Sequence, residues 1–582
     1  MGQYNAPVMA RRSRSSSLPS IKSAPAQAGK PDPTPILLES AYNLDQARAI
    51  LSAYRLRDIE RADRNLQSMA GEPHHRRQLA TLLPRLLSCV SRTADPDQAL
   101  NHWERLLGSV ARGAFLEYLA GAPRMLDLLC TIFGNSDALA FTILRDPTLV
   151  YWLGEQEVLS KPVSRAEMEH SLYEQLSRLT VTELKLDVLR RHRRRELLRI
   201  GVRDLLRLAD VPETTAALSD LASVLIHAAY QIVDAELRRQ YGVPMHKNRQ
   251  GKWVETGFAV MGMGKLGGHE LNYSSDVDLI YVYASSKGET RVTRRSSEAV
   301  PGAVGISNEE YFEILSRELT RVLTEKTNEG SVFRVDLRLR AEGAVGQLAR
   351  SLDDYAAYYR TRGAVWERLA LLKAWPVAGS LEVGQAFLKM VKPFIVGGPK
   401  EEPALQRALA IVRDVRGVKD MIDAKIADRG HERRNVKLGI GGIREVEFLV
   451  QTIQVIAGKR LPGLLDRNTL RSLDRCAHYR LISQRQRDEL AAAYLFLRDV
   501  EHKLQMVDDM QTHTLPADNE ALEQCAIRMG YDAEDPARGV RQFHADHQYH
   551  RNVIRKLFTL VFFQPEASPI LRSVLRAIGA RR

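Results

Sequence analysis

The sequence predicts an α/β domain with a small mixed sheet, flanked by two mainly α-helical regions. Residues 277–282 form a short run of β-branched, aromatic and aliphatic side chains, which is typical of a strand. Residues 332–340 alternate apolar and charged side chains, which predicts a second strand with one packed face. Leucines recur at helical spacing over residues 172–184, and Glu445, Phe448, Leu449 and Thr452 also follow helical spacing. The strand patterns therefore lie in the middle of the chain, between helical patterns.

The 582 residues are enough for several domains. The first 36 residues contain six Ser and six Pro and only one acidic side chain, which favours disorder. Pro212 is expected to open a long helix that continues to Tyr230. We predict a disordered tail over residues 1–36, a helical region over 37–240, the α/β domain over 241–395, a helical bundle over 396–565 and a basic tail over 566–582.

Composition narrows the class of protein and its partners. The net charge of +13 favours anionic partners without choosing among nucleotides, nucleic acid and acidic proteins. The four cysteines are far apart and form no Cys-x-x-Cys, so neither a disulfide framework nor a zinc module is expected. This cysteine usage fits a reducing, cytoplasmic setting. No apolar run approaches the roughly 18 residues that a membrane span requires, so no membrane partner is expected.

A basic run, Arg190–Arg195, stands out within the first helical region. We interpret it as the solvated face of a helix, since charge runs on helices usually have that role. The alternative is a surface that docks an acidic partner or nucleic acid. Nucleic acid is the less expected partner, because no aromatic-rich basic strand accompanies the run.

The most informative stretch is GMGKLGGHELNYSSDVDLIY, residues 262–281. Asp276 and Asp278 are one residue apart at the start of the predicted strand, so their side chains should leave the same face. Two adjacent carboxylates repel each other unless a cation lies between them. Mg²⁺ fits, because it binds through one or two carboxylates and takes further ligands from water and phosphates.

Glycines precede these aspartates and would allow the backbone to approach a phosphate. Gly264, Gly267 and Gly268 form the turn, and Lys265 adds a positive charge. The pattern is not a Walker A loop, because Gly-x-x-x-x-Gly-Lys-Ser/Thr is missing here. The alternative is an ordinary turn followed by solvent-facing aspartates.

The second predicted strand adds a third carboxylate. Phe333, Val335, Leu337 and Leu339 are expected on its packed face. If this strand lies beside the first, Asp336 on its other face becomes a third metal ligand, and the neighbouring arginines meet phosphate oxygens. The alternative is a half-exposed strand whose charges are simply solvated.

Three glycines, Gly439, Gly441 and Gly442, precede a predicted helix that begins near Arg444. A helix amino terminus can bind an anion. The same glycines are equally compatible with a tight packing turn.

Several blocks resemble one family in the same order. They are FRVDLRLR at 333–340, WERLALLKA at 366–374, KLGIGGIREVEFLVQ at 437–451 and FLRDVEHKLQMVDDMQTHTLP at 496–516. Together with residues 262–281, they resemble the glutamine synthetase adenylyltransferase/deadenylylase family over about residues 94–562. The resemblance implies a DNA polymerase β-type nucleotidyltransferase fold for the central α/β domain. The partners that it implies are glutamine synthetase, a PII-type signal protein, ATP or ADP, and phosphate.

The wording of the motifs is similar to the amino-terminal, deadenylylating half of that family. This half removes AMP from a tyrosine of glutamine synthetase by phosphorolysis and releases ADP, in control of nitrogen assimilation. We expect one catalytic centre, because the other Asp-x-Asp, at 95–97, contains a proline and resembles a helix start. Adenylylation of glutamine synthetase from ATP and a non-catalytic regulatory binding module remain alternatives.

The resemblance also implies roles for individual residues. Lys373 is a candidate for phosphate binding, and its alternative is a solvated lysine beside a buried Trp366. Three departures from the family pattern, Ala341, Gln347 and Trp375, are expected near the phosphate or substrate side. The expected catalytic residues and Mg²⁺ ligands are Asp276, Asp278 and Asp336, and the expected nucleotide-binding residues are Gly264, Lys265, Gly267, Gly268, Ser275, Arg338, Arg340 and Lys373.

Overall fold

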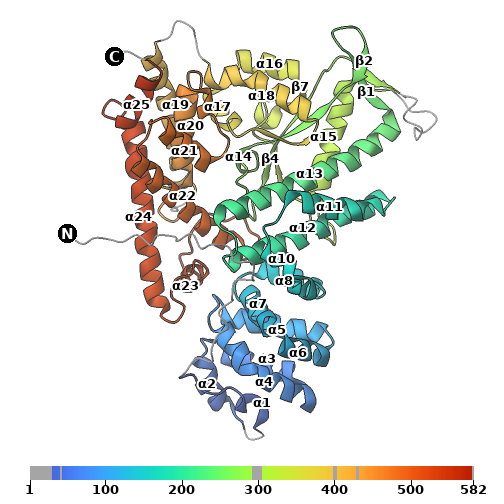
Figure 1. The fold of residues 1–582 in the computed structure, drawn as a ribbon, viewed down its shortest axis with the longest axis vertical. Helices are drawn as coiled ribbons and strands as arrows, with labels where there is room; N and C mark the ends of the chain where they lie inside the picture. The colour runs from blue at the N-terminus through green and yellow to red at the C-terminus, as the bar shows by residue number, and fades with distance from the viewer. Residues whose placement is uncertain (1–28, 40–41, 292–304, 398–402, 428–431, 580–582) are drawn as a thin grey trace.

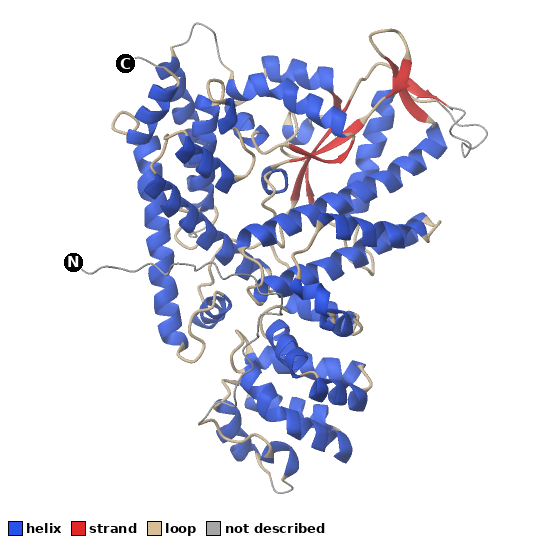
Figure 2. Ribbon diagram, in the orientation of Figure 1, coloured by secondary structure: helices blue, strands red, loops and turns tan. Residues whose placement is uncertain are grey.

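The computed structural model describes residues 29–39, 42–291, 305–397, 403–427 and 432–579. Helices predominate, and two small sheets lie among them (Figures 1 and 2). The mostly helical architecture with a small mixed sheet is therefore as predicted. Within these residues, every strand lies between Val243 and Gly379, with helices before and after.

The amino-terminal helices begin at side chains that cap them. Asp95 accepts a hydrogen bond from the Gln98 amide, with Pro96 at the first helical position, so this Asp-x-Asp is a helix start, as predicted. Asp210 caps the helix that Pro212 opens in the same way. The helices are α1 Pro35–Leu38, α2 Leu44–Ser52, α3 Ile59–Ala70, α4 Pro73–Val90, α5 Pro96–Ser109, α6 Arg112–Gly121, α7 Pro123–Phe133, α8 Asp137–Arg145, α9 Leu149–Gly154, α10 Gln156–Ser160, α11 Arg165–Ser177, α12 Thr182–Leu205 and α13 Val211–Tyr241.

Two sheets follow α13. The larger is mixed: its first two strands are antiparallel, and two short strands from later in the chain join in parallel. Its order is β6-β4-β3-β8, with β7 also paired to β4, and the smaller sheet has the order β2-β1-β5. The strands are β1 Val243–Lys247, β2 Trp253–Glu255, β3 Phe258–Gly262, β4 Val277–Tyr283, β5 Glu289–Arg291, β6 Val335–Asp336, β7 Ala349–Ser351 and β8 Trp375–Gly379.

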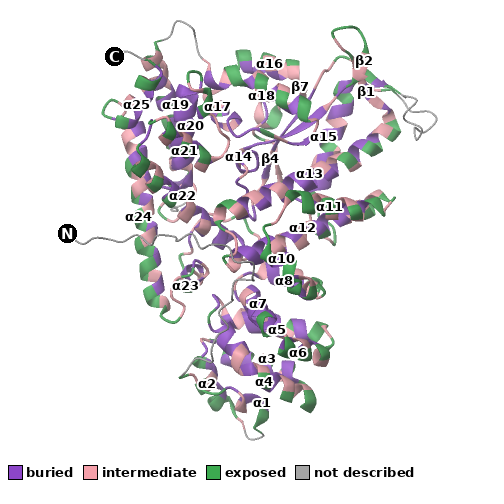
Figure 3. Ribbon diagram, viewed as in Figure 1, coloured by how far each residue is buried: buried purple, intermediate pink, exposed green. Residues whose placement is uncertain are grey.

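The remaining helices lie between the strands or form the carboxyl-terminal bundle. Nearly every residue of the bundle's central helix, Ile443–Ala457, is buried (Figure 3). The helices are α14 Gly264–Gly267, α15 Asn308–Thr324, α16 Leu352–Thr361, α17 Val365–Leu371, α18 Leu381–Val396, α19 Ala404–Ala427, α20 Ile443–Ala457, α21 Thr469–His478, α22 Gln484–Gln505, α23 Asn519–Arg528, α24 Pro536–Phe562 and α25 Pro569–Ala577, with 3-10 turns at Gly343–Val345 and Pro462–Leu464.

The central sheet separates two hydrophobic cores. Val277, Leu279 and Tyr281 of β4 pack with α11, α12, α13 and α15. Ile280 and Val282, on the opposite face, pack with the helices from α16 to α25. Because side chains alternate along a strand, Asp276 and Asp278 share the face of Ile280 and point toward the carboxyl-terminal bundle.

Helix α13 is long and apolar enough, by length and composition, to cross a membrane, and it is the only such helix within the described ranges. The prediction that no apolar run approaches this length was therefore wrong. About 67% of its most apolar window is buried inside the protein. It packs on α12, α15 and β8, so it has the environment of a core helix.

The basic run Arg190–Arg195 is not the solvated helix face that the sequence predicted, because Arg190 and His192 are buried and only Arg191 is fully exposed, while docking of an acidic partner stays an alternative. Arg194 donates hydrogen bonds to the backbone carbonyl and the carboxylate of Glu329. Arg193 lies over the ring of Phe333, with its guanidinium carbon 5.4 Å from the ring centroid. The run therefore holds α12 against the segment that leads into β6, because its arginines contact acidic and aromatic side chains of that segment.

The strand predicted over residues 332–340 is much shorter, since only Val335–Asp336 pair with β4. Asp336 accepts hydrogen bonds from the backbone and side chain of Arg338, and this turns the chain away from the sheet. As a result Leu337 packs on one side of the sheet and Leu339 on the other. The predicted alternation therefore ends where a local side-chain bond replaces the strand ladder.

The two predicted tails differ from expectation in part. Residues 1–28 lie outside the described residues, so disorder there stays a prediction. Lys30 donates a hydrogen bond to Ser91, which ties the end of the predicted tail to the helical region. At the other end, Pro569–Ala577 form α25, whose Ile570, Leu571 and Val574 are buried.

Candidate active site

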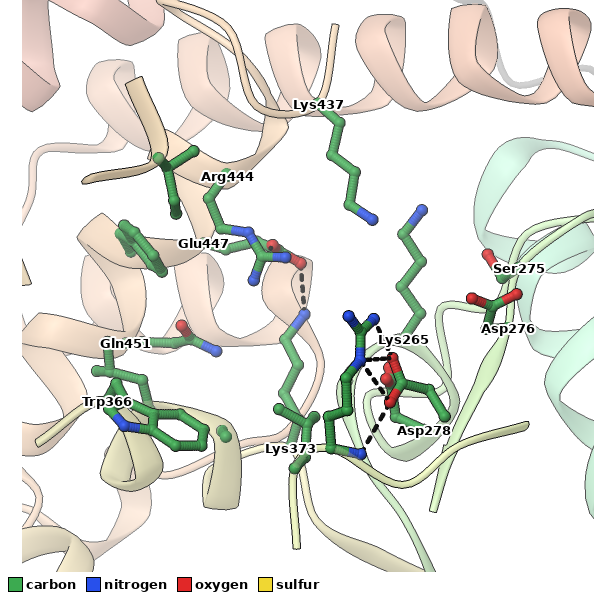
Figure 4. A pocket seen from close by; sticks show the side chains of 18 of the residues that line it. Lys265, Ser275, Asp276, Asp278, Trp366, Lys373, Lys437, Arg444, Glu447 and Gln451 are labelled. Atoms are coloured by element: carbon green, nitrogen blue, oxygen red, sulfur yellow. Dashed lines mark hydrogen bonds and ion pairs between the residues drawn. The ribbon is translucent and has the colours of Figure 1, made fainter. Parts of the chain in front are cut away.

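Asp278 and Asp336 meet at the edge of the central sheet. They are register partners in the parallel pairing of β4 with β6. Asp276 lies immediately before β4, and all three carboxylates line one cavity of about 550 Å³. Figure 4 shows this cavity, with Asp276 and Ser275 at one end and Trp366 and Gln451 at the other. The strand that carries Asp336 therefore does lie beside the first, which was the condition for counting Asp336 with the aspartate pair.

The three carboxylates have different surroundings. Arg334 pairs with Asp276 at 2.8 Å, and Arg338 pairs with Asp336 at 2.9 Å. The hydrogen bond from Arg338 is the main reason that the pKa of Asp336 is lowered. Asp278 has no side-chain partner among the residues that the structure describes. Burial, followed by the charges of Asp336 and Asp276, raises the pKa of Asp278 to about 6.

This donor set fits a hard divalent cation. An unpaired, partly buried carboxylate with a raised pKa and two neighbouring carboxylates is an arrangement that a cation stabilises. As the side chains stand, the described ranges contain no converging group of three metal-ligating side chains. Arg334 and Arg338 each hold one of the carboxylates, Asp276 and Asp336, in an ion pair.

The glycine turn closes the cavity beneath Asp278. Gly264 has φ +52°, and a β-carbon there would come within 2.4 Å of the Asp278 carboxylate. Gly267 packs against the backbone carbonyls of Gly262 and Lys373, so its lack of a side chain serves packing. A β-carbon at Gly268 would likewise meet neighbouring groups. Only Gly264 of these glycines lies against a predicted catalytic group and lines the cavity.

Two of the predicted phosphate-binding cations are engaged in buried ion pairs. Lys265 binds Glu501 of α22 at 2.8 Å. Lys373 lies between Glu270 and Glu447, at 2.8 and 2.7 Å. The interpretation of Lys373 as a solvated lysine is wrong, since it is 5% exposed. Both lysines line the cavity, but each also joins the α/β domain to the carboxyl-terminal bundle.

The two arginines after β6 are placed differently. Arg338 is exposed and reaches the cavity from its rim. Arg340 is 8% exposed and donates to the backbone carbonyls of Leu337, Ala344 and Gly346. Its bonds therefore close the loop between β6 and β7, on the open side of the carboxylates rather than in the main cavity.

The cations on the opposite side of the cavity were not predicted as site residues from the sequence. Lys437 and Arg444 face Asp278 across the cavity (Figure 4). The ammonium group of Lys437 has no hydrogen-bond partner among the described residues, and burial lowers its pKa. Both residues lie in the block at residues 437–451. The sequence signal that could have pointed to them is the presence of basic side chains beside a glycine turn.

The three glycines of that block form a packing turn. A β-carbon at Gly441 would come within 2.3 Å of the Arg551 carbonyl, and Gly439 and Gly442 are also enclosed by backbone carbonyls. The packing alternative is therefore supported by the structure. The turn still has a consequence for the cavity, because it places Lys437 before α20 and Arg444 in its first turn.

The three departures from the family pattern lie away from the cavity lining, contrary to expectation. Ala341 is buried in the core. Gln347 binds Glu309 on the surface, and Trp375 packs under the Arg467 guanidinium. These substitutions change packing and surface contacts rather than groups that face the carboxylates.

The cavity therefore has the three aspartates on one side and Lys437 and Arg444 on the other, where Arg444 also pairs with Glu447 at 3.5 Å. Carboxylates can hold a cation, and that cation with Lys437 and Arg444 can hold a phosphate between them. The far end, near Trp366 and Phe448, is apolar. Such a site suits a ligand with a charged phosphate and an apolar ring.

Comparison with known proteins agrees with this chemistry. Residues 126–390 match the family described as glutamate-ammonia ligase adenylyltransferase, and residues 416–562 match the family described as GlnD PII-uridylyltransferase. The chain is 38% identical over 445 residues to a protein of Nitrosococcus oceani named bifunctional glutamine synthetase adenylyltransferase/adenylyl-removing enzyme. That alignment covers 76% of this chain and 43% of the relative.

Relatives with the same name occur in other bacteria. The protein of Hahella chejuensis is 35% identical over 76% of this chain and 43% of its own length. The protein of Mesorhizobium japonicum is 39% identical over 71% of this chain and 40% of its own length. The chain thus spans less than half the length of the curated relatives that it matches.

Proposed function

From the premise that the chain contains a domain of the glutamate-ammonia ligase adenylyltransferase family, over residues 126–390, we propose that it removes AMP from an adenylylated tyrosine of glutamine synthetase. The reaction is phosphorolysis. An oxygen of inorganic phosphate bonds to the AMP phosphorus, the bond from phosphorus to the tyrosine oxygen breaks, and tyrosine and ADP are the products.

The observation that carries this proposal is the opposition of charges across one cavity. Asp276, Asp278 and Asp336 lie on one wall, and Lys437 and Arg444 lie on the other. A nucleotidyl transfer needs positive charge around the phosphorus and ordered carboxylates for a cation. A non-catalytic module has no comparable need for an unpaired carboxylate with a raised pKa.

We assign Asp276, Asp278 and Asp336 as the ligands of Mg²⁺. When bound, Mg²⁺ stabilises charge on the entering and leaving oxygens. Arg334 and Arg338 hold two of these carboxylates in place before the cation arrives. Gly264 leaves room for the third, since any side chain there would displace the Asp278 carboxylate.

The remaining residues bind and orient the phosphates. Lys437 and Arg444 neutralise the incoming phosphate, and Lys265 and Ser275 border the same space. Arg338 reaches the phosphorus from the rim, where its planar guanidinium suits phosphate oxygens. Arg340 and Lys373 support the site indirectly, because their side chains bind protein groups.

The broader setting is also proposed. We infer a polymerase β-type nucleotidyltransferase domain over residues 241–395, between the helical regions at 37–240 and 396–565, with the cytoplasm as its location. The match of residues 416–562 to a PII-uridylyltransferase family supports a PII-type protein as a second partner. ATP, ADP and phosphate are the proposed small ligands.

Adenylylation of glutamine synthetase from ATP is the second candidate, since the relatives' name includes both activities. Two incubations distinguish them: adenylylated glutamine synthetase with phosphate and Mg²⁺, and unmodified glutamine synthetase with ATP and Mg²⁺. Mass spectrometry of glutamine synthetase should show loss of AMP in the first. Gain of AMP in the second alone reverses the assigned direction, and no change in either overturns both functions.

A further inference from the structure

The apolar end of the cavity contains a polar group without a protein partner. Gln451 of α20 is 7% exposed and lines the cavity. Its side-chain amide has no hydrogen-bond partner among the residues that the structure describes. The amide oxygen and nitrogen are not among the buried unpartnered atoms, so they open onto the cavity, where water or a ligand can bond to them. A ligand that enters this end displaces that water and has to replace its hydrogen bonds.

The surroundings of Gln451 suit a flat ring. Leu369, one turn after Trp366 in α17, and Phe448, one turn before Gln451 in α20, line the same cavity, as does Ile422 of α19, and Trp366 is 39% exposed. Figure 4 shows Trp366 and Gln451 together, far from Asp276 at the charged end. A ring placed there would cover apolar surface, and Trp366 offers an indole face for stacking.

Resting on the proposed function, we propose that this end of the cavity binds the adenine ring and that the Gln451 amide recognises its N6 and N7 edge. An amide oxygen can accept from the adenine N6 amino group while the amide nitrogen donates to N7. Guanine presents two acceptors, O6 and N7, on that edge. The amide oxygen of Gln451 is itself an acceptor, so it would face another acceptor and could not form a hydrogen bond.

A tyrosine ring is the competing occupant, because the proposed substrate also carries one. A phenol offers a single hydroxyl, which can bond to only one half of the amide at a time. The other half would be covered by the ring, lose its water and gain no partner. Adenine offers a donor and an acceptor side by side, and therefore satisfies both halves of Gln451.

The order of groups along the cavity agrees with a nucleotide. Arg444 and Lys373 lie between the Gln451 end and the carboxylate end (Figure 4). The phosphates would meet Arg444 and Lys437, and the phosphorus that reacts would lie near Asp278. The carboxyl-terminal bundle would thus supply base recognition, and the sheet would supply the reacting groups.

The test is calorimetric titration of the full chain with Mg²⁺ and ADP, GDP or 7-deaza-ADP, which lacks N7. The wild-type chain should bind ADP about tenfold or more tightly than the other two nucleotides. Gln451→Leu should abolish this preference and leave the affinity for pyrophosphate unchanged. Gln542→Leu, on the exposed face of α24, is the matched control and should behave as wild type.

Trp366→Ala is a second variant at a half-exposed position, so it tests the same end without a buried substitution. This variant should bind ADP about tenfold more weakly, because the ring loses its stacking contact with the indole. The inference is overturned if Gln451→Leu keeps the preference for ADP. It is also overturned if both variants bind nucleotides as wild type does and only react more slowly with adenylylated glutamine synthetase. ADP preference that depends on Gln451 in a chain without deadenylylation supports the subsite and rejects the proposed function.

Discussion

Asp278 and Asp336 lie side by side in adjacent parallel strands, yet only Asp336 has a cationic partner. The ion pair with Arg338 lowers the pKa of Asp336, whereas burial and the neighbouring carboxylates raise that of Asp278 to about 6. This asymmetry leaves Asp278 as the group that gains most from a bound cation. The first two predictions depend on it.

Asp278→Asn should stabilise the metal-free protein at pH 7. An unfolded aspartate has a pKa of about 3.9. The native state therefore binds more protons than the unfolded state between about pH 4 and 6, and stability falls as pH rises through that window. The gain at pH 7 should be about 1–3 kcal/mol and should vanish below about pH 4. Urea denaturation at the two pH values measures it, and an equal effect at both would contradict the assigned pKa.

Mg²⁺ should raise the melting temperature of the wild-type chain and not that of Asp278→Asn. The cation stabilises the folded form because it binds the native carboxylates. Thermal unfolding with and without Mg²⁺ gives the difference. Asp414→Asn, on the exposed side of α19, is the control and should keep the full shift. A shift in Asp278→Asn equal to that of wild type would remove Asp278 as a ligand.

Gly264→Ala should abolish AMP removal. The residue has φ +52°, and the new β-carbon would displace the Asp278 carboxylate. We expect at least a hundredfold lower rate, about 3 kcal/mol in the barrier. Gly417→Ala in α19 meets open space and should instead add roughly 0.5–1 kcal/mol of stability. A Gly264→Ala enzyme with normal turnover would show that the tight turn has no catalytic consequence.

Lys437→Met should raise the KM for inorganic phosphate more than it lowers kcat. The lysine faces Asp278 and has no protein partner in the part of the chain that the structure describes, so its charge is available to a ligand. Initial rates at varied phosphate give both constants. Lys459→Met, exposed after α20, should leave them unchanged. If both constants match wild type, Lys437 does not contact the phosphate.

Lys373→Met should destabilise the fold by about 3–5 kcal/mol. The substitution leaves the Glu270 and Glu447 carboxylates buried without the lysine that neutralises them. The double variant Lys373→Met/Glu447→Gln removes one of the two charges and should recover part of the loss. Urea denaturation of the single and double variants checks this. Equal stability of wild type and Lys373→Met would mean that solvent reaches this cluster.

Local sequence patterns predicted β4 and the helix starts at Asp95 and Asp210. These features depend on side-chain alternation, proline position and capping, which act over a few residues. Predictions from these patterns were wrong where segments that are distant in the sequence come into contact in the fold. The Arg190–Arg195 run looked solvated because Glu329, which pairs with Arg194, lies 135 residues away.

The mixed architecture and the shared face of Asp276 and Asp278 could be predicted from the sequence, because strand alternation and the spacing of these two residues are local. The position of Asp336 beside them, and which cations remain available, depend on the tertiary structure. It buries Lys265 and Lys373 against glutamates from the carboxyl-terminal bundle and leaves Lys437 without a partner among the described residues. It also directs Gln451 toward the same cavity. These outcomes depend on packing between residues 74 to 236 positions apart in the sequence, as for Lys373 with Glu447 and Lys265 with Glu501, which local patterns do not reveal.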